Sequence, residues 1–216
     1  MKVAAVATVA FWVLISIGGA ANWQYKQYQE FLSSLAADGV PHPEWAITAL
    51  VLLAISHALL VPGLAKWHPG VAAAVAVAAL ALVFVTVFRI SCPGGARYCT
   101  PEPASPSADV FHGAAVLLYT MAVVSALMLA ATQHRAAPVK RVRGIAVVVV
   151  AVVGTLACGH ALLTLDGLAQ RIWLLAAQIG LLLAASAASG EMARRERLAT
   201  KERLADAVPA ALVEAT

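Results

Sequence analysis

Six long apolar runs, separated by short polar stretches, dominate the chain at about residues 3–21, 45–64, 71–90, 108–132, 144–165 and 167–189. Each approaches the roughly 20 apolar residues that a helix needs to cross the hydrocarbon core of a bilayer. The runs are continuous Ala, Val and Leu blocks, without the apolar–polar alternation of membrane-barrel strands. The pattern predicts an all-α integral membrane bundle of six transmembrane helices over residues 1–190, followed by a charged cytoplasmic tail over 191–216.

Composition supports a membrane protein and excludes other classes. Hydrophobic residues make up 62% of the chain and charged residues 12%, with a mean hydropathy of +0.83. A soluble domain carries about 25% charged residues. Because no basic stripe with interleaved aromatic residues is present, we expect no nucleic-acid partner. The expected partners are membrane lipids or, for an accessory subunit, another membrane protein.

The first apolar run has an alternative interpretation as a secretory signal, because small residues precede Asn22. We expect a spanning helix instead, since the run is long for the apolar region of a signal peptide. The aromatic and polar residues that follow predict a short interfacial helix, ended by Gly39 and Pro41. Four tryptophans fall near the predicted interfaces: Trp23, Trp45, Trp67 and Trp173.

The distribution of Lys and Arg predicts the orientation. With six crossings, 11 of the 15 basic residues share one side with both termini, and the other side holds Lys26, Arg89, Arg97 and Arg171. The positive-inside rule then places both termini in the cytoplasm. The expected location is the inner (plasma) membrane, with the loop that contains Cys92 and Cys99 outside the cytoplasm.

Cys92 and Cys99 lie in the same predicted outer loop, with Pro93, Gly94 and Gly95 allowing the chain to turn back between them. On an oxidising face this pair predicts a structural disulfide. A redox-active pair is the alternative, although such pairs usually have two intervening residues at a helix N-terminus. Cys158, within the fifth run, is expected to be an inert buried thiol.

Ionisable and polar residues from several predicted helices share one depth near the outer leaflet. They are Glu44, Arg89, Asp109, His112, His160, Asp166, Gln170 and Arg171. Ionisable groups in or near the apolar zone usually face the bundle interior or a wet cavity. The set predicts a polar pocket for a lipid headgroup or a small polar ligand, in which Arg89 and Arg171 would suit a phosphate. The alternative is that each residue is a helix cap or an interfacial anchor.

Two other functions fit some of these residues. Asp109 or Glu44 as acid and His112 as base would suit a small membrane enzyme acting on an amphiphilic substrate. A haem-binding electron carrier would use His57 with His112 or His160 as axial ligands. No Cys-x-x-Cys-His, Walker or His-Glu-x-x-His motif is present, so the sequence predicts no cofactor and no metal.

Three stretches taken in order resemble the bacterial domain-of-unknown-function 998 family of six-helix membrane proteins. They are residues 31–44, residues 89–114 with the cysteines and Asp109-x-x-His112, and the turn at residues 166–171. The family is distantly similar to the Frag1/DRAM/Sfk1 group, some of whose members are implicated in phospholipid distribution. The resemblance implies lipid or headgroup interaction at Ser33, Glu44, Asp109, His112, Gln170 and Arg171.

Overall fold

The computed structural model describes residues 1–27, 29–92, 97, 99, 105–132 and 166–213, without the side chains of residue 166 and residues 204–213. The described part is helical and contains no strand. Its elements are α1 (Lys2–Ala21), the short 3-10 helix η1 (Leu32–Ala36), α2 (Glu44–Trp67), α3 (Pro69–Val87), α4 (Pro106–Thr132) and α6 (Asp166–Val213). The predicted helix over 144–165 lies outside the described residues, as do His160 and Cys158.

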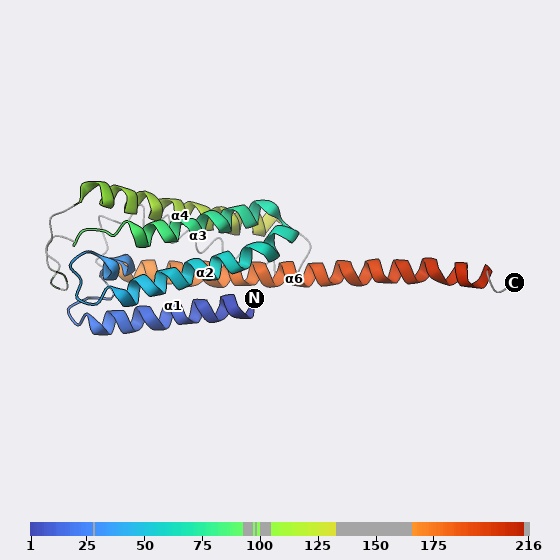
Figure 1. Cartoon of the computed structure of the whole chain (residues 1–216), viewed down its shortest axis with the longest axis horizontal. Helices are drawn as coiled ribbons and strands as arrows, with labels where there is room; N and C mark the ends of the chain where they lie inside the picture. The colour runs from blue at the N-terminus through green and yellow to red at the C-terminus, as the bar shows by residue number, and fades with distance from the viewer. Residues whose placement is uncertain (28, 93–96, 98, 100–104, 133–165, 214–216) are drawn as a thin grey trace.

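The first four long helices form an antiparallel series in which each packs against the next, and α6 packs against α2 and α4 (Figure 1). The connection between α1 and α2, the segment after α3 and the start of α6 meet at one end of the bundle. This end also contains the bonded Cys92 and Cys99, and we call it the disulfide end. The N-terminus lies at the opposite end.

In the described part of the chain, the helices α1, α2, α3, α4 and α6 each have the length and apolar composition needed to cross a membrane. Apolar side chains cover the outside of the bundle as well as its interior; Leu117, for example, is 63% exposed. A helix that is apolar on all sides belongs in a protein core or a membrane. The outer surface is therefore that of a membrane-embedded protein.

Small side chains bring the helices together in the interior. Buried alanines include Ala46 and Ala49 of α2, Ala78 of α3 and Ala126 of α4. Small residues allow close backbone approach, which favours helix association in a bilayer. Two buried or half-buried polar pairs add cross-links: Thr8 Oγ1 to Ser56 Oγ at 2.9 Å, and Trp12 Nε1 to Gln178 Oε1 at 2.9 Å.

The helix ends differ from those predicted, for local reasons. Helix α2 continues past the predicted end at 64 to Trp67, with Pro62 inside it. Helix α3 starts at Pro69 because His68 Nδ1 accepts the Val71 N–H at 3.2 Å and caps it. It ends at Val87 rather than 90: the backbone of Phe88 leaves the helical conformation (φ −94°, ψ 85°), and the Ser91 N–H donates to Asp109 Oδ1 instead of bonding back into the helix.

Helix α6 runs through the predicted boundary at 190 as one continuous helix of 48 residues. It projects well beyond the rest of the bundle (Figure 1). The segment after Gly190 contains many good helix formers, and an Arg195–Glu191 ion pair at 3.2 Å joins successive turns. Its side chains from Ala193 to Arg203 are exposed.

Candidate functional site

The connection between α1 and α2 lies over the disulfide end, and we call its described residues 22–27 and 29–43 the cap segment. The predicted interfacial helix is here the single 3-10 helix η1, and Gly39 turns the chain with a φ of 78°. Trp23 is 82% exposed, whereas Tyr25 is buried. The cap segment is therefore partly a folded layer of the protein.

Arg89 attaches the cap segment to the end of α3. Its Nε donates to the Ala36 carbonyl at 2.7 Å, its Nη2 donates to the Ala37 carbonyl at 2.8 Å, and its Nη1 lies 3.1 Å from Asp38 Oδ1. The Asp38 N–H donates in return to the Ile90 carbonyl at 3.0 Å. The carbonyls at a helix C-terminus lack partners within the helix, and Arg89 supplies them for η1.

Arg171 attaches the same cap segment to α6. Its Nη1 donates to the Gln27 carbonyl and, at 2.9 Å, to the Gly167 carbonyl, and its Nη2 donates to the Tyr25 hydroxyl at 2.7 Å. The neighbouring Gln170 accepts the Leu32 N–H at 2.5 Å through Oε1. The two arginines that the sequence suggested for a phosphate thus donate mainly to the protein's own oxygen atoms.

Asp109 and His112 hold the chain just after α3. Asp109 Oδ1 accepts the Ser91 N–H at 2.7 Å, and His112 Nδ1 lies 2.7 Å from the Phe88 carbonyl. Because a carbonyl oxygen can only accept, Nδ1 carries the proton, and in the neutral ring Nε2 is an acceptor. This Nε2 is buried and has no partner in the described part of the chain.

The predicted site residues therefore fall into separate groups. Arg89, Asp109 and His112 surround residues 88–91, and Gln170 and Arg171 hold the first half of the cap segment. Glu44 is exposed at the start of α2, with His42 Nδ1 at 3.2 Å from its carboxylate.

Three further predicted residues are Ser33, Asp166 and His160. Ser33 lies half-buried within η1, and its hydroxyl makes no hydrogen bond to the described residues. The side chain of Asp166 lies outside the described part, as does His160.

The predicted disulfide is confirmed: Cys92 and Cys99 are bonded, with their Cα atoms 5.9 Å apart. Cys99 is buried against the core. Among the described residues, no group of three or more His, Cys, Asp or Glu residues could hold a metal ion.

An open hollow of about 270 Å³ lies at the disulfide end, and sequence reasoning missed it. Its lining is residues 21–24 together with Pro41, His42 and Arg97. Arg97 is exposed, and it makes no ion pair with the described residues. We define these residues as the polar hollow. The polar–aromatic sequence after α1 could have indicated it. Arg97 was predicted only to be one of four basic residues on the outer side.

Asn22 connects the polar hollow to the bundle. Its amide nitrogen donates to the Gly18 carbonyl at 2.9 Å and lies 3.4 Å from the His42 carbonyl. Its Oδ1 is buried and has no partner in the described residues. A buried oxygen without a donor is uncommon in native proteins.

A second unusual group lies in the middle of the bundle. The rings of His57 (α2) and Tyr119 (α4) have centroids 5.8 Å apart, and Trp173 (α6) meets Tyr119 edge to face at 5.6 Å. Each has a buried polar atom without a partner in the described residues: His57 Nε2, Tyr119 Oη and Trp173 Nε1. Trp173 is buried between helices, and its expected position near a membrane interface stays a prediction.

Fold and site together define a multi-helix membrane protein with a folded cap and a small polar hollow at one end. Residues 5–187 match the family model described as "Protein of unknown function (DUF998)". The chain therefore belongs to the DUF998 family, as the sequence resemblance indicated. No curated protein and no solved structure matches it. The distant similarity to the Frag1/DRAM/Sfk1 group stays a prediction.

Proposed function

We propose that this protein is a non-enzymatic, multi-pass plasma-membrane protein that binds the phosphate-bearing headgroup of a lipid in the polar hollow. The observation that carries the proposal is the position of Arg97 and His42 around a hollow that starts where the apolar helix α1 ends. Arg and protonated His form strong charge-assisted hydrogen bonds with phosphate. The exposed ring of Trp23 suits the headgroup depth of a bilayer.

The size of the polar hollow supports a headgroup as the bound part. Pockets for whole small molecules typically have about 300–1,000 Å³, and this hollow has about 270 Å³. A complete lipid would not fit inside it, so the apolar part of the ligand would lie outside, against the bundle. Arg89 and Arg171 contribute indirectly in this proposal, because they fix the cap segment that forms one wall.

The orientation and the sixth span are part of the proposal. Helices α4 and α6 both start at the disulfide end (Figure 1), and the apolar residues 144–165 between them would provide a return crossing. With 11 basic residues on the side of the termini, the disulfide end would face outside the cytoplasm. Impermeant thiol reagents should then label Lys26→Cys and spare Lys66→Cys in intact cells, in a Cys158→Ala background. The reverse labelling would contradict this orientation.

Lipid retention tests the binding site directly. The protein is purified in mild detergent and its lipids are measured by mass spectrometry, for the wild type and for an Arg97→Ala, His42→Ala variant. We expect the retained phosphate-bearing lipid to fall by about tenfold or more, since each charge-assisted bond contributes about 1.5–3 kcal/mol. Lys26→Ala removes an exposed cation of the cap segment outside the hollow and should leave retention unchanged. Equal retention in all three proteins would contradict the proposal.

A further inference from the structure

We infer that the end of the bundle opposite the disulfide binds anionic phospholipid through four basic side chains: Lys2, Lys66, Arg194 and Arg197. We call these four residues the basic end. The inference concerns the other end of the molecule from the polar hollow and does not depend on headgroup binding there. It is carried by the sign of the exposed charges and by their depth relative to the apolar surface.

The exposed charges of the basic end are contributed by three helices. Lys2 is the first residue of α1, and Lys66 lies in the last turn of α2. Arg194 and Arg197 follow the membrane-length part of α6, and all four side chains are exposed. None of them makes an ion pair with the described residues. Among the described residues, therefore, no carboxylate neutralises them by direct contact.

The acids of α6 do not face the two arginines. Arg194 and Arg197 are three positions apart and share one face of the helix. Glu196 lies between them in sequence, but residues one or two positions apart do not face each other. Glu191 is three positions from Arg194, and its carboxylate bonds Arg195 at 3.2 Å. The shared face is thus positively charged.

The N-terminus shows the depth at which this charge lies. Ser189 Oγ is 3.4 Å from Met1 Sδ, and the exposed apolar surface of α1 begins nearby at Val3, which is 67% exposed. The apolar surface therefore ends near the level of Ser189. Helix α6 continues past this level along the bundle axis (Figure 1). At a rise of 1.5 Å per residue, Arg194 and Arg197 are about 7.5 and 12 Å further along.

The direction of α6 turns both arginine side chains back toward the membrane. Side chains of an α-helix tilt toward its N-terminus, and the N-terminal part of α6 packs within the bundle. A long arginine stem can then bring its charged group to the headgroup layer. An anionic surface attracts basic groups within about one Debye length, roughly 8 Å at physiological salt. Lys201 and Arg203, about 18 and 21 Å beyond Ser189, lie outside this range.

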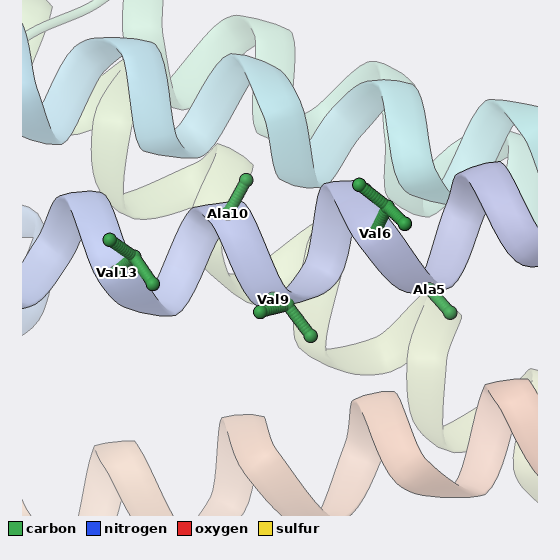
Figure 2. A pocket seen from close by; sticks show the side chains of 5 residues that line it. All are labelled: Ala5, Val6, Val9, Ala10 and Val13. Carbon is green, nitrogen blue, oxygen red and sulfur yellow. The ribbon is translucent and has the colours of Figure 1, made fainter.

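The protein surface next to Lys2 is apolar, as the chains of a lipid require. Val6, about one turn further along α1, is 67% exposed. An open hollow of about 480 Å³ on this helix, shown in Figure 2, is lined by Ala5, Val6, Val9, Ala10 and Val13. This surface accepts any acyl chain, so the selection made at the basic end is for headgroup charge. Arginine suits the phosphate, and a headgroup without a cation of its own avoids repulsion.

The experiment measures the dissociation constants of two lipids with identical chains, by native mass spectrometry of the detergent-purified full chain. The lipids are dioleoyl phosphatidylglycerol, which is anionic, and dioleoyl phosphatidylcholine, which is zwitterionic. Both carry a phosphate, so the ratio of their affinities reports the effect of net charge. We expect phosphatidylglycerol to bind at least about tenfold more tightly, because each basic residue near an anionic surface contributes about fivefold.

Arg194→Ala, Arg197→Ala should reduce this preference at least about fivefold. Lys201→Ala, Arg203→Ala removes the same charge from the same helix beyond the reach of headgroups and should leave the preference unchanged. Arg194→Lys, Arg197→Lys keeps the charge and should keep the preference, which separates a charge effect from a folding defect. The same ratio measured in the Arg97→Ala, His42→Ala variant excludes a contribution from the polar hollow and should equal that of the wild type.

Four results would overturn the inference. The first is equal affinity of the wild type for the two lipids, and the second is an equal loss in the two double-alanine variants. The third is a preference that disappears with the cations of the polar hollow. The fourth is displacement of phosphatidylglycerol by millimolar glycerol 3-phosphate, which would show that the basic end takes a soluble phosphate ester as well as a lipid.

Discussion

Arg89 lies 3.1 Å from Asp38, and the two residues connect the end of α3 to the cap segment across 51 positions of sequence. The contact is reciprocal, because the Asp38 N–H donates to the Ile90 carbonyl next to Arg89. Arg89 also bonds the Ala36 and Ala37 carbonyls. A planar guanidinium can make several such bonds at fixed angles, which a lysine ammonium cannot do in the same way.

Arg89→Ala should therefore destabilise the cap segment. Removal of two charge-assisted bonds takes the Arg89 donor from the Ala36 carbonyl and leaves the Ala37 carbonyl with only the Val40 N–H at 3.4 Å. We expect a loss of roughly 2–4 kcal/mol in the free energy of unfolding. Thermal unfolding in detergent and limited proteolysis of the cap segment measure this loss. Arg97→Ala removes the same charge from a side chain without a partner in the described residues and should leave the unfolding temperature unchanged. Equal effects of the two variants would contradict a clamping role for Arg89.

Gly167 is predicted to be essential for the approach of α6 to the cap segment. A Cβ atom at this position would collide with the main-chain carbonyl groups of Glu30 and Gln27. Backbone cannot move aside as a flexible side chain can, so Gly167→Ala should cost about 1–3 kcal/mol. Gly113→Ala, where a Cβ has open space, should be neutral or slightly stabilising, because alanine favours a helix. Comparison of the two unfolding curves tests the packing.

Removal of the buried hydroxyl of Tyr119, unlike the Arg89 and Gly167 substitutions, is not expected to lower the free energy of unfolding. The hydroxyl is buried without a partner in the described residues, and replacement of such a group by an apolar one of the same shape can be neutral or stabilising. Tyr119→Phe should thus keep or raise the unfolding temperature. Trp12→Phe removes a bond that Gln178 uses and should lower stability by about 1–3 kcal/mol. A destabilised Tyr119→Phe would indicate a bonded partner for the hydroxyl in the folded protein.

The sequence was sufficient for features that depend on local pattern. Apolar runs of membrane length predicted the five described helices that are long and apolar enough to span a membrane, because a helix satisfies its own backbone groups inside a bilayer. The spacing of Cys92 and Cys99 predicted the disulfide. The helix ends were less accurate, since they depend on local contacts such as the cap by His68 and the bond from the Ser91 N–H to Asp109.

The roles of the polar residues could not be predicted in the same way. The charge of Arg89 or Arg171 is equally suited to a ligand phosphate and to a row of carbonyls, and the choice depends on partners 53 and 144 positions away. The position of Trp173 near a helix end did not indicate that its ring would pack edge to face against Tyr119. Arg97, in contrast, lies in no recognisable motif, so its place in the lining of the polar hollow could not be predicted.

Glu30 in the cap segment gives the protein a pH dependence that can be measured. Burial raises the pKa of Glu30 above its ordinary value of 4.5, although the Lys26 N–H and the Lys26 charge act in the opposite direction. A raised pKa means that the fold favours the neutral carboxyl, so stability falls as the pH rises from 4.5 through the pKa of the folded state. Glu30→Gln should therefore raise the unfolding temperature at pH 7, and its advantage should disappear below about pH 4. Glu196→Gln, on the exposed part of α6, controls for the removal of one negative charge. An advantage of Glu30→Gln that is the same at both pH values would show that ionisation of Glu30 does not affect folding.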